Sequence, residues 1–202
     1  MLKASRFAAL AFALAASTAV AQQKGYAAGS TVADFTLADL DGNKQSLKGL
    51  AENKKAVVVC FWSRDCEAAR ASESRLAKLR ADYHEKGVVF VHVVSNKKEN
   101  KAEDDVKKTR EQVKAKKVEW LVLLDPDNKI ADAFDARVTP AFFVIDAKDL
   151  KVAYAGALTD DPWKDAKVTK EYVKDAVDAV LAGKTPATTT TKAEGTSIKR
   201  VR

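Results

Sequence analysis

Residues 56–70, AVVVCFWSRDCEAAR, constrain the possible folds more than any other part of the 202-residue chain. The first seven are all apolar, which is typical of a strand buried on both faces of a parallel sheet. Further on, the apolar residues recur at helical spacing between charged ones: Ala68, Ala71, Leu76, Leu79 and Tyr83. The pattern therefore predicts a buried strand that passes into a long helix through the short turn at 63–66.

This pattern places Cys66 at the start of the predicted helix. The unpaired N–H groups and the dipole of a helix N-terminus favour the thiolate form of a cysteine over the thiol. The flanking carboxylates Asp65 and Glu67 act in the opposite direction. The helix effect, about 1 kcal/mol, is comparable with one partly screened charge, so the sequence leaves the pKa of Cys66 open.

The strand, the Phe-Trp pair, the turn and the cysteine resemble the thioredoxin fold, in particular exported redoxins of the AhpC/TSA type. In thioredoxins the turn reads Trp-Cys-x-x-Cys-Lys/Arg. Here Cys66 matches the first cysteine, Ala69 replaces the second, and Arg70 keeps the basic residue. The resemblance implies an α/β domain with a central mixed sheet flanked by helices, and a site with one thiol.

A second match lies in the other half of the chain. The run VTPAFFVID at 138–146 is similar to the strand that, in this fold, begins with a cis-proline packed against the active-site cysteine. An X–Pro bond is the one peptide bond at which the cis form is cheap. The resemblance implies that Thr139 and Pro140, with Trp62, line a substrate groove.

Other stretches predict the rest of the domain. Alternation at 33–37, a turn at 41–43 and a return strand at 44–47 resemble the N-terminal β-hairpin that redoxins add to the fold. The first long helix should end at Gly87. The further expected strands are 88–95, 120–124 and 151–155, and the further expected helices are 103–116, 130–136 and 169–181.

The N-terminus is typical of a secretory signal peptide. Lys3 and Arg6 precede a short apolar run, and Ala19-Val20-Ala21 forms a cleavage site before Gln22. The run is shorter than the ~20 residues of a membrane span, and no cysteine follows the site to carry a lipid. We expect a periplasmic or secreted protein without a stable membrane anchor.

We expect three segments: the signal peptide at 1–21, a redoxin domain at 22–183 and a flexible tail at 184–202. Cleavage removes two of the 35 basic residues and none of the 28 acidic ones, so the net charge falls from +7 to +5. The excess lies in lysine-rich surface helices and the tail, without a compact basic patch, so nucleic acid is not an expected partner. The threonine-rich run at 188–191 has too little apolar surface to predict order.

The tail ends in Gly-Thr-Ser-Ile-Lys at 195–199. This ending is similar to that of a peroxiredoxin-like subgroup whose chains close with Gly-Cys-Ser-Ile-Lys. Thr196 stands where that subgroup has a cysteine, so the resemblance implies that a second partner thiol is absent.

The resemblance implies peroxidase or thiol–disulfide chemistry at Cys66. Peroxiredoxins frame their cysteine with Pro-x-x-x-Thr/Ser-x-x-Cys; here Ser63 keeps the hydroxyl, while Val59 replaces the proline. Arg70 or Arg137 is the candidate source of positive charge. A peroxide or a protein thiol or disulfide would be the substrate, an external thiol the reductant, and no cofactor or metal is expected.

Several alternatives stay open at this stage. Cys66 could be a vestigial residue in a protein that only binds a peptide or protein partner in the cell envelope. Cys60 is expected to be a small buried side chain, although a bond to Cys66 is the alternative. Trp62 could serve packing as well as a substrate, and Ser63 could simply cap the helix. A copper site is disfavoured because Arg70 occupies the position that a second ligand cysteine would need.

Overall fold

The computed structural model describes residues 25–116, 121–163 and 167–201. The predicted signal peptide lies outside these residues. The strands are β1 (Thr36–Asp39), β2 (Lys44–Ser46), β3 (Ala56–Trp62), β4 (Val88–Val94), β5 (Leu121–Leu124), β6 (Val138–Thr139), β7 (Ala141–Asp146), β8 (Val152–Gly156) and β9 (Thr196–Ser197). The helices are α1 (Leu47–Ala51), α2 (Glu67–Tyr83), the 3-10 turn η1 (His84–Lys86), α3 (Lys97–Asn100), α4 (Glu103–Ala115), α5 (Lys129–Ala133) and α6 (Tyr172–Leu181).

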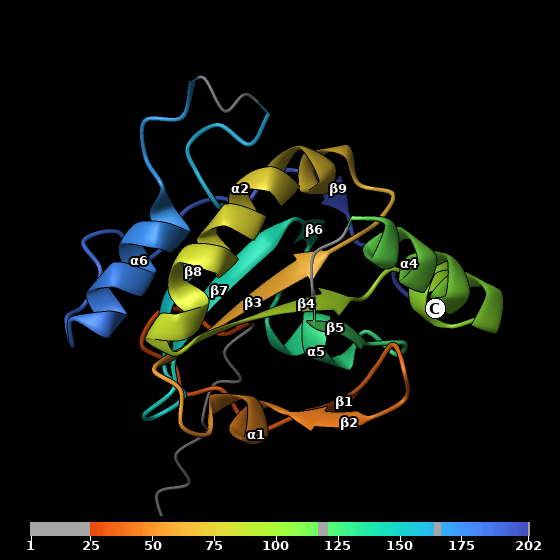
Figure 1. Ribbon diagram of the computed structural model, residues 1–202, viewed down its shortest axis with the longest axis horizontal. Coiled ribbons are helices and arrows are strands. Elements are labelled where there is room, and N and C mark those ends of the chain that lie inside the picture. The colour runs from red at the N-terminus through yellow and green to blue at the C-terminus, as the bar shows by residue number, and fades with distance from the viewer. Residues whose placement is uncertain (1–24, 117–120, 164–166, 202) are drawn as a thin grey trace, which may run out of the picture.

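Within the described residues, seven strands form one mixed sheet in the order β2-β1-β5-β4-β3-β7-β8 (Figure 1). Strands β3, β4 and β5 run parallel, whereas β7 and β8 join antiparallel beside β3. The hairpin β1–β2 is attached to β5 by antiparallel pairing. The sheet confirms the predicted thioredoxin fold with its N-terminal hairpin.

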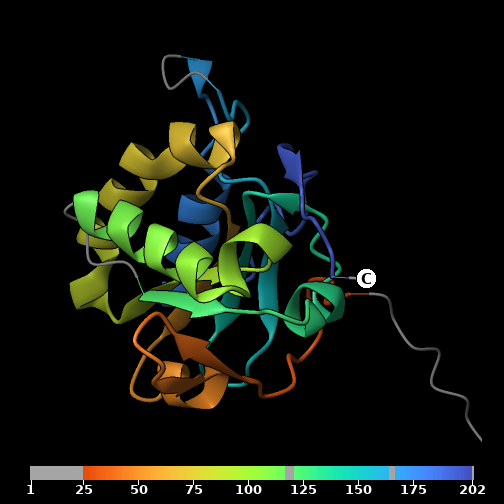
Figure 2. The same ribbon diagram turned by 90° about the vertical axis from the view of Figure 1, so that its right-hand side faces the viewer.

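Strand β3 lies in the middle of the sheet, and all seven of its residues are buried. Successive side chains of a strand point to opposite faces. Val58 and Cys60 therefore pack with α2 and α6, whereas Val59 and Phe61 pack with α1 and α5 on the other side. Figures 1 and 2 show these helices on the two faces of the sheet. The unbroken apolar run is explained by this double burial.

Helix α2 and η1 together cover the helix predicted from Cys66 to Lys86. Gly87 ends the turn in the left-handed conformation with a φ of 86°, which glycine adopts without strain. The buried hydrophobic side chains of α2 face β3 and α6: Ala68, Ala69, Leu76, Leu79 and Tyr83. This packing fixes the start of α2, and with it Cys66, above the end of β3.

The predicted flexible tail is instead packed along the domain. Ala155 of β8 exchanges backbone hydrogen bonds with the threonine run: its N–H donates to Thr189, and its carbonyl accepts from Thr191. Farther on, β9 pairs with β6, and Ile198 is buried. The expectation was wrong because backbone hydrogen bonds to the edge of the sheet need few apolar side chains.

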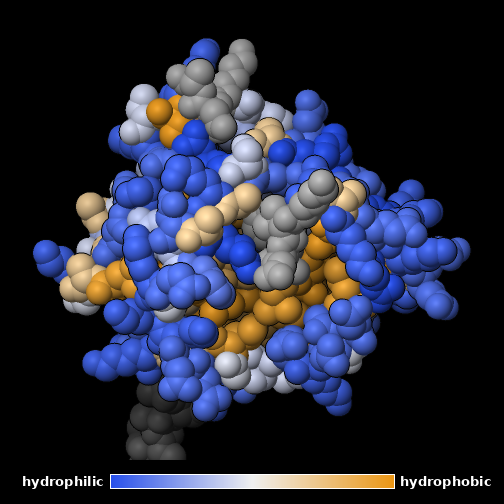
Figure 3. Space-filling model, viewed as in Figure 1, coloured by the Kyte–Doolittle hydropathy of each residue, from blue (hydrophilic) through white to orange (hydrophobic). Residues whose placement is uncertain are grey.

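The face of the molecule seen in Figure 3 is mostly hydrophilic, with apolar residues gathered in the hollow between α2 and α4. Among the described residues, no helix combines the length and the apolar character that crossing a membrane requires.

Candidate active site

Cys66 is the N-cap of α2, in an extended conformation just outside the first turn. Its Sγ accepts a hydrogen bond from the backbone N–H of Ala69, with an N–S distance of 3.4 Å. Its own N–H donates to the carbonyl of Ser63 at 3.2 Å, which closes the turn between β3 and α2. The sulfur therefore accepts from one of the N–H groups at the helix start that have no carbonyl partner within the helix. This is the position that the sequence predicts.

The Thr139–Pro140 peptide bond lies beside this sulfur and is cis. The thiol of Cys66 donates to the carbonyl oxygen of Thr139, with an S–O distance of 2.9 Å. The two residues are 73 positions apart in the chain. Because β3 and β7 are neighbours in the sheet, the end of one strand and the beginning of the other bring them together.

The surroundings shift the ionisation of Cys66 in opposite directions. Burial raises the pKa of its thiol, while hydrogen bonding with Thr139 and Thr196 and the hydrogen bond from the N–H of Ala69 lower it. The hydrogen bonds outweigh burial, and the pKa lies below the ordinary value of 9.0. The site therefore favours a thiolate more than an exposed cysteine does.

Cys66 itself is fully buried, with an exposed fraction of 0 %. Reactive cysteines ordinarily lie at sites that are at least partly exposed, and Cys66 in this structure does not. Its cover is the C-terminal segment, in which Thr196 pairs with Thr139 across β6 and β9. The physical reason is the packing of the tail, which places a strand over the sulfur.

Ser63 does not direct its hydroxyl to the sulfur. It donates to Oε1 of Glu99 at 2.6 Å, and the N–H of Arg64 donates to Oε2 at 3.0 Å. Glu99 is 2 % exposed, and burial raises the pKa of its carboxyl, against the lowering effect of these hydrogen bonds. Ser63 thus ties the turn to α3, and its hydroxyl is not directed at the site in which the peroxiredoxin motif would use it.

Neither predicted arginine contacts Sγ among the described residues. Arg70 donates to the carbonyl of Arg64 at 3.3 Å, and Arg137 forms a bidentate pair with Asp135 at 2.9 and 3.2 Å. The guanidinium that does line the small pocket beside Pro140 belongs to Arg75 of α2. Helical spacing alone could not place Arg75 next to a loop that lies so far along the chain.

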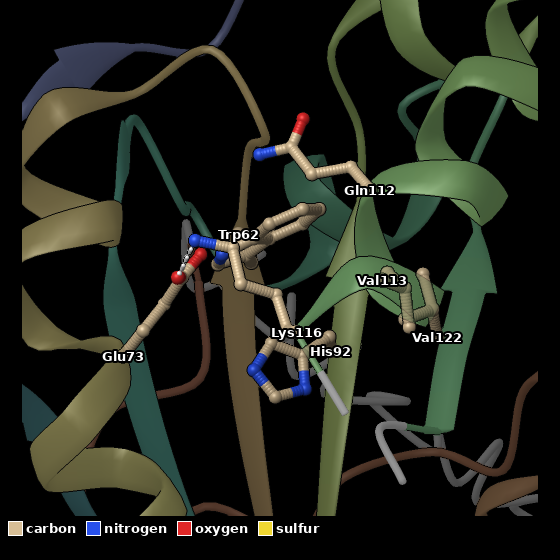
Figure 4. Close-up of a pocket in the computed structure, with 7 residues that line it drawn as sticks. All are labelled: Trp62, Glu73, His92, Gln112, Val113, Lys116 and Val122. Carbon is tan, nitrogen blue, oxygen red and sulfur yellow. Dashed lines mark ion pairs between the residues drawn. The ribbon is translucent and has the colours of Figure 1, made fainter. Parts of the chain in front are cut away.

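Trp62 packs inside the domain (Figure 4). Its ring lies edge-to-face with His92, with 6.0 Å between centroids. The cavity that both line measures about 10 Å³, about the room that one water molecule needs. The ion pair of Glu73 and Lys116, 2.5 Å between Oε2 and Nζ, borders it. Trp62 is therefore a packing residue here, while Thr139 and Pro140 do lie at the sulfur.

Cys60 and Cys66 are both free thiols in the structure. Cys60 lies in the middle of β3, where burial, and then the charge of Cys66, raise the pKa of its thiol well above 9.0. A neutral, enclosed Cys60 fits its predicted role as a small core residue.

Two residues at the site escaped the sequence-based reasoning. Glu99 is a buried carboxylate whose partners lie 35 and 36 positions away, and no local pattern reports such contacts. Thr196 was noticed only as part of the Gly-Thr-Ser-Ile-Lys ending. That motif was the available signal, but the contact with Cys66 needed the fold.

Comparisons with known proteins agree with this geometry. The model of the AhpC/TSA family matches residues 28–155. A hypothetical protein from Sinorhizobium meliloti has a similar structure, with a TM-score of 0.78, 31% identity, and coverage of 88% of this chain and 96% of that chain. No curated protein sequence matches the chain significantly.

Two further solved structures are also similar. The thioredoxin domain of a thiol-disulfide oxidoreductase from Bacteroides vulgatus has a TM-score of 0.52 and 26% identity, covering 63% of this chain and 86% of that chain. Peroxidoxin BcpB from Mycobacterium tuberculosis has a TM-score of 0.55 and 21% identity, covering 78% and 95%. Because the sequence identity to this second structure is only 21%, the similarity supports the fold alone.

Proposed function

The chain belongs to the AhpC/TSA family, and we propose that it is an exported thiol oxidoreductase with peroxidase activity, acting through Cys66 alone. Family membership confirms the redoxin class. The single observation that supports the chemistry is the position of Sγ between the N–H of Ala69 and the Thr139 carbonyl, before a cis-proline. The N–H of Ala69, at the start of α2, donates to Sγ and favours the thiolate that a nucleophile requires, and the pKa of Cys66 is lowered.

The proposed reaction has two steps. The thiolate attacks one oxygen of a hydroperoxide, the O–O bond breaks, and the leaving oxygen takes a proton and departs as water or an alcohol. Sulfur loses two electrons and becomes a sulfenic acid. Two equivalents of an external thiol then reduce it, giving a disulfide, water and the free Cys66. An external thiol is needed because Cys60 is buried and its pKa is raised.

Access to Cys66 requires movement, because the sulfur is covered. We infer that the covering element, β9, which contributes two residues to its pairing with β6, moves aside to admit a substrate. The second candidate function, a redox-inactive binding protein, is favoured by this same full burial of Cys66. The two candidates differ in whether peroxide changes the sulfur.

Peroxide consumption in the presence of a small thiol separates them. We expect wild-type protein to consume hydrogen peroxide, Cys66→Ser to lose this activity, and Cys60→Ser to keep it as the matched control. If wild type and Cys66→Ser consume hydrogen peroxide at equal rates, Cys66 is not responsible for the consumption. That result would favour the redox-inactive binding protein. Capture of the same partner by wild type and Cys66→Ser would then support that alternative.

Export is the second part of the proposal. It is supported by Lys3 and Arg6, the apolar run after them, and the cleavage site that precedes Gln22. We expect the protein recovered from an expressing bacterium to reside outside the cytoplasm with Gln22 as its first residue. Intact-mass measurement of the fractionated protein checks this, and a cytoplasmic protein that retains residues 1–21 would contradict it.

A further inference from the structure

A buried carboxyl group that the proposed reaction does not use lies beside the turn that carries the thiol. Glu99 of α3 is 2 % exposed, and its two oxygens accept from the hydroxyl of Ser63 at 2.6 Å and from the N–H of Arg64 at 3.0 Å. Burial raises the pKa of Glu99, and these hydrogen bonds lower it only in part. Burying a carboxyl group costs free energy, so its place at this turn needs an explanation.

The two residues that Glu99 holds lead directly into Cys66. The carbonyl of Ser63 accepts from the N–H of Cys66 at 3.2 Å, and Sγ of Cys66 accepts from the N–H of Ala69 at 3.4 Å. A shift of Ser63 or Arg64 therefore moves the cysteine relative to the start of α2. The position of the sulfur at the helix N-terminus depends on where Glu99 holds the turn.

The side chain of Arg64 is held by the same part of the chain. Its guanidinium donates to the carbonyls of Lys98 and Asp105 at 3.1 and 2.7 Å, and to the hydroxyl of Thr109 at 3.1 Å. The Thr109 hydroxyl is also hydrogen-bonded to the carbonyl of Glu99, at 3.2 Å. Both the backbone and the side chain of Arg64 are therefore fastened to α3 and to the first turns of α4.

Helix α3 is itself fixed to the sheet by the residue that follows Glu99. Asn100 is 4 % exposed, and its Nδ2 donates to the carbonyl of Val94 at 2.6 Å and to that of Asp125 at 3.0 Å. Val94 ends β4, which pairs with β3, and Asp125 directly follows β5. The carboxyl of Glu99 is therefore held on a rigid support at the end of the parallel strands, next to the turn that it contacts.

We propose that Glu99 is a positioning residue of the thiol site, which holds the turn at Ser63 and Arg64 so that Sγ of Cys66 stays at the N-terminus of α2. The inference rests on the proposed function, because it takes Cys66 as the reacting thiol, and it adds a residue from α3. Ser63 then serves the thiol through Glu99. Such placement matters because a displacement of about 1 Å costs a reacting group about a hundredfold in rate.

The test uses the opposite effects of position and charge on the pKa of Cys66. A displaced Sγ loses its donor at the helix start, which raises the pKa, whereas the loss of a nearby negative charge lowers it. Ser63→Ala and Glu99→Ala remove hydrogen bonds to the turn. Glu99→Gln removes the charge and keeps the shape, with an oxygen that accepts from Arg64 and an amide that donates to Ser63. Glu103→Gln, an exposed residue of α4, is the matched control.

The pKa of Cys66 is measured in the full chain from its rate of alkylation against pH, and peroxide consumption is measured on the same proteins. We expect Ser63→Ala and Glu99→Ala to have about tenfold less thiolate at any pH well below the pKa, as the loss of one hydrogen bond to a charge predicts. Both should consume peroxide more slowly. Glu99→Gln should keep the wild-type pKa or a lower one, and Glu103→Gln should keep the wild-type pKa.

A titration that stays unchanged in Ser63→Ala would overturn the inference, even if urea unfolds this variant more easily, because a purely structural role lowers stability alone. Ser63→Ala keeps the test decisive if Glu99→Ala does not fold. A pKa raised in Glu99→Gln as well would also overturn the inference. If wild type consumes peroxide and the titrations are unchanged, the role of Glu99 fails and the proposed function stands. If the titrations shift as expected and wild type consumes no peroxide, Glu99 positions the thiol and the proposed function fails.

Discussion

His92 is a titratable side chain in the middle of β4, and it is 3 % exposed. It lies opposite Cys60 in the parallel pairing of β3 and β4, and its ring packs on Trp62. Burial, and then the charge of Arg80, lower the pKa of His92 from 6.5 to about 3. In the folded protein the imidazole therefore stays neutral until the pH falls to about 3. In an unfolded chain it takes up a proton near pH 6.5.

This difference makes folding sensitive to acid. The pKa of the folded state is below that of the unfolded state, so the unfolded chain binds the proton first, and stability is lost as pH falls from about 6.5 to about 3. The contribution of His92 to the slope approaches about 1.4 kcal/mol per pH unit. We expect a shallower slope for His92→Gln in urea unfolding measured across that range.

His84→Gln is the matched control, because His84 lies at the end of α2 with its side chain half exposed. It should leave the wild-type slope in place. A slope in His92→Gln as steep as that of wild type would show that other groups cause the loss of stability.

At the scale of elements, the C-terminal segment is what closes the site. A Cβ at Gly195 would collide with the carbonyl of Thr139, whereas one at Gly183, which also has a positive φ, would meet no atom within 4 Å. Gly195→Ala and Gly183→Ala both place a side chain at a positive φ, of 154° and 68° respectively, and only the first also produces the collision.

We expect Gly195→Ala to displace β9 and to raise the rate at which a maleimide modifies Cys66. Strain of about 1.4 kcal/mol at β9 corresponds to about tenfold faster modification, measured at a pH at which the thiol is fully ionised. Gly183→Ala should react as wild type does. The cover assigned to β9 is contradicted if Gly195→Ala reacts no faster than Gly183→Ala.

The elements differ in how well the sequence predicts them. The strand β3 and the helix α2 follow from local apolar spacing, because their cores lie on faces that such spacing defines. The approach of Cys66 to Pro140 followed from family resemblance. The packing of 184–201 and the anchoring of Ser63 by Glu99 depend on contacts between distant segments, on which periodicity carries no information. Composition predicted a flexible tail because composition, like periodicity, carries no information on such contacts.

At the scale of the whole molecule, the site is assembled from three parts of the chain. Cys66 comes from the junction of β3 and α2, Pro140 from the loop before β7, and Thr196 from the end of the chain. The sheet between two apolar cores holds the first two, and backbone hydrogen bonds of Ala155 in β8 hold the segment that leads to the third. The central claim is that this assembly makes one sulfur, Cys66, oxidisable by peroxide.

The most direct measurement is the mass of the peptide that contains Cys66 after the full-length protein has reacted with hydrogen peroxide and dimedone. The account predicts one dimedone adduct on Cys66, formed equally in Cys60→Ser and absent without peroxide. A Cys66 that stays unlabelled while the protein is folded and the peroxide concentration stays constant would contradict it.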